Sequence, residues 1–374
     1  MNQIILKLIF FLIYTTLSNA DSTTIDHNNE ISLLEQSCND GHSMSCHNLI
    51  ILSDRYKMEL PQNKRLDFHQ KACQGNIKES CIALWKLYYG EKKYTQALFF
   101  IEKSCNLGDI RSCTYAAETY LKDDAIPYDP LKAIEFYTQG CNSKEGAYNC
   151  LMLGVMNHEG TGIPKNNIQA IKYLNQACSS NREYRACSLL GLIYAEENNY
   201  SKAKELYAKA CQYGDEKGCM FLGNLYLSGK GVERSLGEFL RYYEKACDGK
   251  NGQDACYTLA SMQISDTNSE MRDITIFKLL EKSCSGGNAK GCLVLSFIYQ
   301  NGYMISRDFL NTLESLSIQL QQNSSLNDFN FTKDKYKMTS VVSSNKEKAH
   351  SFLQQSCNLK SSLGCKLYKK EIIF

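Results

Sequence analysis

The residues of this chain that could do the most chemistry are its cysteines, of which there are 18 among 374 residues. A cysteine can bind a metal, act as a nucleophile or form a disulfide, and its spacing helps to decide which. No two cysteines here are separated by only two residues, the spacing by which zinc modules bring ligand pairs together. We therefore expect no metal and no cofactor.

The first 20 residues indicate the redox compartment. Lys7 is followed by an apolar run from Leu8 to Leu17 and by the small-residue end Ser18-Asn19-Ala20. This pattern is typical of a cleaved signal peptide, and its apolar core is too short to span a bilayer. We expect the mature chain to begin at Asp21 and to be secreted or periplasmic. An even number of cysteines in an oxidising compartment favours disulfides, with free structural thiols as the alternative.

The charge balance argues against a nucleic-acid partner. The chain has 42 Lys and Arg against 40 Asp and Glu, whereas phosphate binding needs a basic surplus. With 43% hydrophobic and 22% charged residues, the composition is that of a folded globular protein. No later segment is apolar for long enough to span a membrane. The motifs H-E-x-x-H, G-x-S-x-G and the P-loop are absent.

The cysteines repeat with a fixed period. They form nine neighbouring pairs, whose first members recur every 32 to 37 residues and once after 73. A period of this length is typical of solenoid proteins. The pairs are Cys38/Cys46, Cys73/Cys81, Cys105/Cys113, Cys141/Cys150, Cys178/Cys187, Cys211/Cys219, Cys247/Cys256, Cys284/Cys292 and Cys357/Cys365.

A helix, which we name helix B, is predicted to end at the first cysteine of each pair. The residue before that cysteine is small, namely Ala72, Ser104, Gly140, Ala177, Ala210, Ala246, Ser283 and Ser356. Four residues earlier the side chain is large, namely Phe68, Phe100, Phe136, Tyr173, Leu206, Tyr242, Leu279 and Phe352. This spacing places both positions on one face of an α-helix.

A second helix, helix A, is predicted to follow the second cysteine of each pair. Three residues on, most repeats have leucine, as at Leu49, Leu84, Leu153, Leu190, Leu222, Leu259 and Leu295, and one has Ala116. Four residues on, six repeats have a small residue, which indicates a closely crossing helix: Ala117, Gly154, Gly191, Gly223, Ala260 and Ser296. Tyrosine recurs seven residues on, at Tyr88, Tyr120, Tyr194, Tyr226 and Tyr299.

The segments between helix A and helix B carry turn residues. All four prolines, Pro61, Pro127, Pro130 and Pro164, lie there, where the start of a helix tolerates proline. Glycines at the end of helix A, including Gly160 and Gly229, favour a left-handed helix end. Together these patterns predict an all-α fold, an α/α superhelical solenoid.

The motif that runs from Leu222 to Val232, followed by Lys245-Ala246-Cys247, resembles the Sel1-like repeat, a relative of the tetratricopeptide repeat. With one cysteine at the end of helix B and another in the next helix A, the chain looks like the secreted cysteine-rich Sel1 proteins, of which the Helicobacter cysteine-rich proteins are the best-known group. The resemblance covers roughly residues 30 to 374.

The register of the repeat suggests how the cysteines pair. Each pair brackets the short turn from helix B of one repeat to helix A of the next, as in Cys211 to Cys219. We expect each pair to form a local disulfide. In the chain-entropy model, closing a loop of nine or ten residues stabilises the fold by about 2.5 kcal/mol per bridge.

The resemblance implies a binding function. Related repeats line a concave surface with helix A, so we expect a monomeric scaffold that binds a protein, a peptide or a cell-wall glycan in the cell envelope or towards a host. Penicillin binding and β-lactam hydrolysis, which are ascribed to the Helicobacter group, form the alternative. The S-x-x-K signature of such enzymes occurs at Ser201 to Lys204 and at Ser343 to Lys346, but S-D-N and K-T-G are absent. We therefore expect Ser201, at or near a helix N-cap, to cap the helix.

Three further segments are expected along the chain. Residues 1–20 are the signal peptide, residues 21–29 a short flexible lead, and residues 30–374 the solenoid. Between about 303 and 345 lies a longer polar segment, which is either a degenerate repeat without cysteines or an insertion in one turn.

Overall fold

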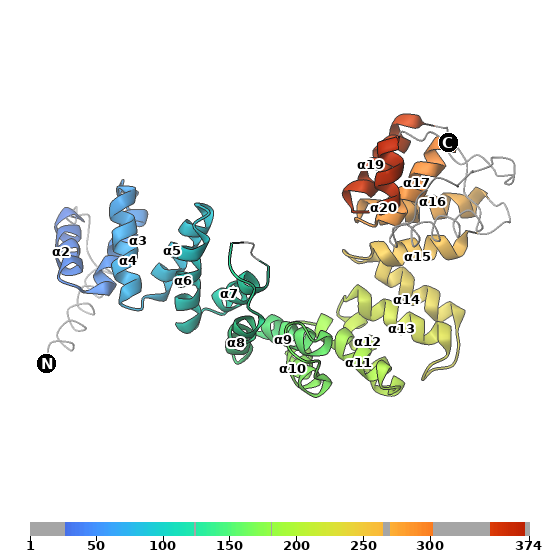
Figure 1. The fold of residues 1–374 in the computed structure, drawn as a ribbon, viewed down its shortest axis with the longest axis horizontal. Coiled ribbons are helices and arrows are strands. Elements are labelled where there is room, and N and C mark those ends of the chain that lie inside the picture. Colours follow the sequence, from blue (N-terminus) through green and yellow to red (C-terminus); the bar gives the residue numbers. More distant parts are fainter. Residues whose placement is uncertain (1–26, 123–124, 181, 265–269, 302–344, 371–374) are drawn as a thin grey trace, which may run out of the picture. The chain divides into compact units, whose positions relative to one another are not determined.

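The computed structural model describes residues 27–122, 125–180, 182–264, 270–301 and 345–370 (Figure 1). Within these residues it consists of 18 helices and connecting turns, with no strand. Two compact units divide the chain, residues 1–143 and residues 144–374. Each is described by itself below.

The first unit has seven described helices. They are α2 (His27–Asn39), α3 (Ser43–Arg55), α4 (Gln62–Gln74), α5 (Lys78–Gly90), α6 (Tyr94–Asn106), α7 (Ile110–Lys122) and α8 (Pro130–Cys141). Helices A are α3, α5 and α7, and helices B are α2, α4, α6 and α8. Each helix packs against the next along the chain, so that α3/α4, α5/α6 and α7/α8 form hairpins.

The second unit repeats the same hairpin. Its helices are α9 (Ala147–Glu159), α10 (Asn167–Ser179), α11 (Arg185–Glu196), α12 (Tyr200–Gln212), α13 (Glu216–Ser228), α14 (Leu236–Asp248), α15 (Gln253–Gln263), α16 (Glu270–Ser285), α17 (Ala289–Asn301), α19 (Lys346–Asn358) and α20 (Ser362–Lys370). In Figure 1 the two members of a hairpin lie side by side, as α13 and α14 do. The expected all-α repeat fold is confirmed.

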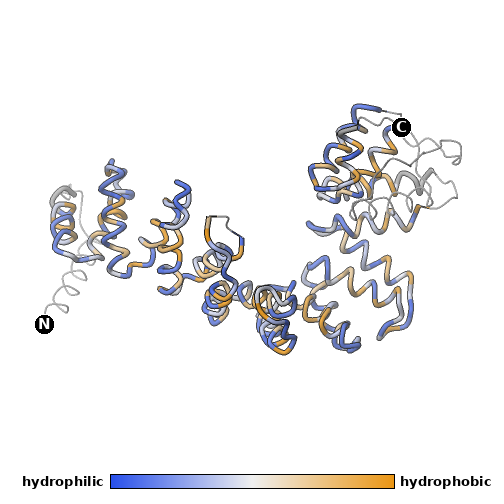
Figure 2. Tube along the Cα trace, in the orientation of Figure 1, coloured by the Kyte–Doolittle hydropathy of each residue, from blue (hydrophilic) through white to orange (hydrophobic). Residues whose placement is uncertain are grey.

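Hydrophobic and hydrophilic positions alternate along these helices at helical spacing (Figure 2). The hydrophobic positions are those that the repeat predicts to be buried. Leu84, Leu153 and Leu190, three residues after the second cysteine of their pairs, are at most 1% exposed. The apolar stripe of each helix is thus covered by its neighbours in the stack.

Local disulfides join helix B to the next helix A, as the register suggests. The structure joins Cys38–Cys46, Cys73–Cys81, Cys105–Cys113, Cys178–Cys187, Cys211–Cys219, Cys247–Cys256, Cys284–Cys292 and Cys357–Cys365, with Cα–Cα distances from 4.2 to 4.9 Å. Cys141 and Cys150 are disulfide-bonded as well. No cysteine among the described residues is free.

The close approach of the helices at each bridge explains the small residues beside it. A Cβ added at Gly218 would lie 2.6 Å from the Cβ of Ala210, and one added at Gly364 would lie 2.4 Å from the Oγ of Ser356. Larger side chains at these positions would force the two backbones apart. The small residue before each cysteine is therefore a packing requirement of the bridge.

Inside the hairpins, a glycine of helix A faces a large residue of helix B. A Cβ at Gly154 would lie 2.5 Å from Leu174, one at Gly191 would lie 2.7 Å from Tyr207, and one at Gly223 would lie 2.9 Å from Tyr243. These contacts confirm the close helix crossing that the small residues predict.

The connections between helices A and B use the expected turn chemistry. Gly160 and Gly229 end α9 and α13 in the left-handed conformation, with φ of 78° and 71°. Pro61 is the N-cap of α4, and Pro130 is the first residue of α8. The short α11–α12 connection has no glycine, and Asn198 takes the positive φ of 62° instead.

The long segment lies in the connection of a single hairpin. Residues 302–344 are outside the described residues, but α17 and α19 on either side pack directly against each other. Helix α19 therefore takes the helix B position on α17.

The described N-terminus differs slightly from expectation. Helix α2 begins at His27, three residues before the predicted start at Glu30, so residues 27–29 belong to a helix and not to the flexible lead. The prediction began at Glu30 because the apolar spacing begins only at Ile31, and a polar first turn gives no such signal. The expected signal peptide, residues 1–20, and residues 21–26 lie outside the described residues. Among the described helices, none is both long and apolar enough to cross a membrane.

Candidate functional site

The first unit contains a pocket of about 360 Å³ between two successive helices A. Trp85 and Tyr89 of α5 line it on one side, and Tyr115, Glu118, Thr119 and Lys122 of α7 line it on the other, with Ile101 of α6 completing the wall. Tyr89 and Tyr115 are 48% and 49% exposed, whereas Trp85 is 7% exposed. The pocket thus combines one buried aromatic ring with two accessible ones.

Trp85 departs from the repeat pattern. It stands four residues after Cys81, where six other helices A have glycine, alanine or serine. In α9, α11 and α13 the small residue leaves room for a large residue of helix B. In α5 the large residue is on helix A, and the facing position of α6 is Ile101, smaller than the Tyr207 and Tyr243 of other hairpins. In this hairpin the larger side chain thus belongs to helix A and the smaller one to helix B, and the Trp85 indole lines the pocket.

The indole of Trp85 is incompletely bonded. Its Nε1 is buried and has no hydrogen-bond partner in the structure. A buried donor without an acceptor costs about 1–3 kcal/mol. Its ring centroid lies 5.1 Å from that of Tyr115, with the planes tilted by 48°. The pocket wall therefore contains an aromatic pair, Trp85 and Tyr115, whose members come from two successive repeats. The indole of this pair carries an N–H group without an acceptor.

Stacked aromatic pairs hold the helices on both sides of the pocket. Tyr88 of α5 stacks on Phe100 of α6 at 5.5 Å, and Tyr120 of α7 stacks on Phe136 of α8 at 6.0 Å. The Tyr88 hydroxyl accepts a hydrogen bond from Gln70 Nε2 at 3.1 Å. Burial raises the pKa of Tyr120, whose hydroxyl donates to Glu102 and accepts from Lys132. These contacts fix α5 and α7 relative to each other.

Lys122 and Glu118 line the pocket, and a second lysine, Lys86, lies beside the Trp85 ring. Lys86 Nζ lies 5.8 Å from the centre of the Trp85 ring, and Lys122 lines the opposite side on α7. Glu118 stands one helical turn before Lys122. The Thr119 hydroxyl donates to the Tyr115 backbone carbonyl at 2.7 Å and is thereby satisfied within α7. Glu118 and Lys122 are thus the charged side chains of the described lining.

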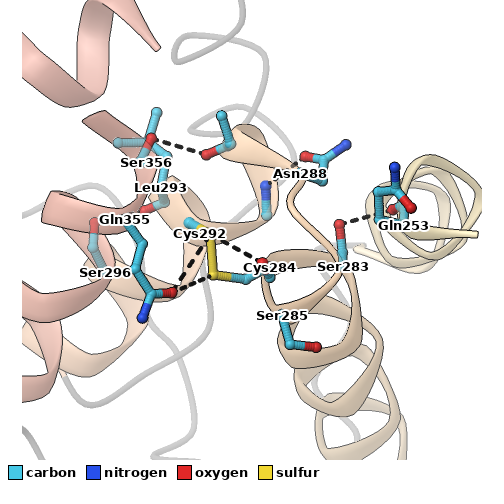
Figure 3. Close-up of a disulfide and its surroundings, with 12 residues drawn as sticks. Gln253, Ser283, Cys284, Ser285, Asn288, Cys292, Leu293, Ser296, Gln355 and Ser356 are labelled. Atoms are coloured by element: carbon cyan, nitrogen blue, oxygen red, sulfur yellow. Dashed lines mark hydrogen bonds between the residues drawn. A yellow bond between two sulfur atoms is a disulfide. The ribbon is translucent and has the colours of Figure 1, made fainter. Parts of the chain in front are cut away.

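The Cys284–Cys292 bridge shows how the cysteines act in their surroundings (Figure 3). Oε1 of Gln355 lies 3.2 Å from Cys284 Sγ and 4.0 Å from Cys292 Sγ. The Ser283 hydroxyl donates to the Gln253 carbonyl at 2.9 Å, and Ser356 donates to the Ala289 carbonyl at 2.9 Å. In both cases a serine of helix B bonds to the first turn of the preceding helix A. The bridge is enclosed by structural hydrogen bonds.

The S-x-x-K residues do not gather into a site. Ser201 and Lys204 are both exposed on α12, and the cap of that helix is Asn199, whose side chain accepts from the Lys202 backbone N–H at 3.3 Å. Ser201 is the second residue of the helix, near the cap but not the cap itself. Ser343 lies outside the described residues, and Lys346 is the first residue of α19. In the described part of the chain, no group of three or more His, Cys, Asp or Glu could hold a metal.

Six segments of the chain match the family model of the Sel1 repeat. They are residues 87–109, 110–144, 150–181, 184–215, 217–251 and 339–361. Outside the matched segments, the described helices α2 to α4 and α15 to α17 keep the same packing of each helix against the next.

Solved structures share the fold. A Sel1 repeat protein from Oxalobacter formigenes aligns with a TM-score of 0.64 and 14% identity over 96% of this chain and 92% of that one. The protective antigen c5321 of uropathogenic Escherichia coli, described as having an SLR fold, aligns with a TM-score of 0.52 and 16% identity over 91% of this chain and 67% of that one. At these identities the likeness concerns the fold.

Curated relatives match locally. Cytochrome c oxidase assembly factor 7 of Xenopus tropicalis is 35% identical over 109 residues, which cover 26% of this chain and 47% of the relative. Assembly factor 7A of Xenopus laevis is 31% identical over the same length. The chain spans about half the length of these relatives.

Sequence reasoning did not single out the pocket. Its signal was the single tryptophan of the chain, standing in a column that is small in six other repeats. Tyr89 and Tyr115 gave no signal, because they lie outside the recurring columns.

Proposed function

Because six segments of the chain match the Sel1 repeat, we propose that it is an exported scaffold which binds a protein or peptide partner on its helices A, in the cell envelope or towards a host. Sel1 repeats generally bind proteins. The observation that carries the proposal is the pocket between α5 and α7, where two half-exposed tyrosines stand beside Trp85. Tryptophan and tyrosine are the residues most enriched at the energetic centres of protein interfaces.

Export is supported by the first 20 residues of the chain and by its disulfides. Residues 1–20 have the pattern of a cleaved leader. Every described cysteine is disulfide-bonded, and disulfides persist in oxidising compartments but are rare in the cytosol of mesophiles.

The assembly of cytochrome c oxidase, named for the frog relatives, is not part of the proposal. The match covers 26% of this chain and less than half of the relative. What the two share is accounted for by the repeat.

Site-specific photocrosslinking in the intact source cell tests the binding function. A photoreactive amino acid replaces Tyr115 in one strain and Tyr128, which is 60% exposed and does not line the pocket, in another. We expect a discrete adduct at Tyr115, outside the cytoplasm, on a chain whose N-terminus is Asp21. Equal adducts at both positions, or a chain that keeps Met1 and stays in the cytoplasm, would contradict the proposal.

A further inference from the structure

We infer that the pocket between α5 and α7 takes a bulky apolar or aromatic side chain of a peptide that carries an acidic residue next to it. The inference names the ligand chemistry of the site and rests on the proposed binding function. Size, aromatic lining and charge each contribute to it.

The size of the pocket fits one large side chain. At about 360 Å³ it lies near the lower end of the usual range for ligand pockets, about 300–1,000 Å³. Its lining includes two half-exposed tyrosines, so that an inserted ring would contact Tyr89 on α5 and Tyr115 on α7 together. Aromatic rings favour such tilted and edge contacts.

The polar groups of the pocket favour an acceptor on the ligand. The buried Nε1 of Trp85 has no acceptor in the structure. An oxygen acceptor on the ligand that reached the indole beside Tyr115 would satisfy this donor, whereas a purely apolar ligand would leave it unsatisfied.

The charged side chains near the pocket also favour an acidic ligand. Lys86 and Lys122 are exposed, and neither forms an ion pair within 4.0 Å with another described residue. Among the described lining residues, Glu118 is the one carboxylate that stands against these two ammonium groups. An acidic residue beside the inserted side chain can pair with either lysine, whereas a basic residue would meet a net positive border.

The test is selection from a random dodecapeptide library displayed on phage, with the oxidised full-length protein as bait. We expect a consensus with an aromatic or large aliphatic residue next to Asp or Glu. A basic consensus, or no consensus that free peptide can compete, would overturn the inference.

Fluorescence then locates the bound peptide. Trp85 is the only tryptophan of the chain, so its emission reports on this pocket alone. A synthetic consensus peptide without tryptophan should shift the emission saturably. Unchanged emission at saturating peptide would place binding elsewhere and overturn the inference.

Variants separate the contributions. Tyr115→Ala should weaken peptide binding at least tenfold, Tyr115→Phe by less than threefold, and Lys122→Glu about fivefold to tenfold, while Lys122→Arg should bind as the parent does. Tyr128→Ala is the matched control for loss of an exposed tyrosine in the same unit. Equal affinity for Tyr115→Ala and the parent would sink the inference. If the crosslink at Tyr115 still forms while acidic peptides fail, the binding function stands and only the ligand chemistry falls.

Discussion

The backbone N–H of Asn345 donates to the carbonyl oxygen of Tyr299 at 2.7 Å. The same bond closes ordinary turns between helices A and B, from Ser235 to Tyr226 at 2.9 Å and from Asn166 to Asn157 at 2.7 Å. After residues 302–344, Asn345 therefore lies where the last residue of a short turn lies in the other hairpins, directly before helix B.

The first prediction follows from this position of Asn345. Replacing residues 302–344 by the sequence of residues 229–234 should keep α17, α19 and α20 folded. Because loop-closure entropy grows with loop length, the shortened chain should be about 1.5 kcal/mol more stable to unfolding. Urea unfolding followed by circular dichroism measures this. Loss of the helical signal of the last hairpin would show that the long segment is needed for the stack.

The second prediction concerns the bridges. Replacing Cys73 and Cys81 together by alanine should lower the free energy of unfolding by about 2–4 kcal/mol, because the unfolded chain gains loop entropy and the core loses two buried sulfur atoms. Urea unfolding of the oxidised variant and parent tests it. Peptide mapping without reduction should find only neighbouring cysteines joined. A long-range pair, or a reduced protein with unchanged melting, would contradict the local scheme.

The third prediction tests the close helix crossing. Gly223→Ala places a Cβ 2.9 Å from the Tyr243 ring and should cost about 1–3 kcal/mol of stability. Gly237→Ala, on the facing helix, is the control, since its Cβ would come no closer than 3.9 Å to a neighbour. That change should stabilise the protein by about 0.5–1 kcal/mol through helix propensity. Equal effects of the two substitutions would show that α13 and α14 do not pack so closely in solution.

The fourth prediction is a pH dependence. Burial, with the nearby Arg65 guanidinium and His47, lowers the pKa of His69 from 6.5 to about 4. Between pH 4 and pH 6.5, His69 therefore binds a proton in the unfolded chain but not in the folded chain. The stability that this imidazole contributes is fully present above pH 6.5 and is lost as the pH falls towards 4.

Substitution of His69 isolates this effect. Because part of the ring is solvated, we expect a loss of about 1 kcal/mol between pH 7 and 4.5 in the parent that His69→Gln does not show. Thermal melting at both pH values measures the difference. His350, near the other end of the chain, supplies the control His350→Gln. An unchanged pH slope in His69→Gln would contradict the assignment.

The fifth prediction separates capping from catalysis on α12. Asn199→Ala should lower stability by about 1 kcal/mol, because the Lys202 N–H loses its side-chain acceptor, whereas Ser201→Ala should change it by less than about 0.5 kcal/mol. Neither variant should alter nitrocefin turnover relative to the parent. A β-lactam turnover lost in Ser201→Ala alone would instead support the hydrolase alternative.

The period of the cysteines was enough to predict the hairpins, because the same small and large residues recur at the same distance from the cysteines in most repeats. The columns occupied by Gly154, Gly191 and Gly223 indicated the helix crossings for the same reason. The cap at Asn199 was harder to place, because Asn199 and Ser201 are both good capping residues and only the backbone decides between them.

The pocket lies beyond the reach of such reasoning. It arises where one copy breaks the rule, with Trp85 in a small-residue column and Ile101 opposite. A departure from a pattern tells where to look, but the positions of Tyr89 and Tyr115 beside the indole follow only from the packing of two neighbouring hairpins.

The bridges also decide how the chain would respond to a pull on its ends. The bridges of the described residues join cysteines eight or nine positions apart, each within one turn between successive helices. Because the S–S bond would carry the force, the enclosed residues could not extend. Each bridge would therefore shorten the fully stretched chain by roughly 25–30 Å. Hairpins could still unfold one after another, and each could refold from a bridged junction that had stayed closed.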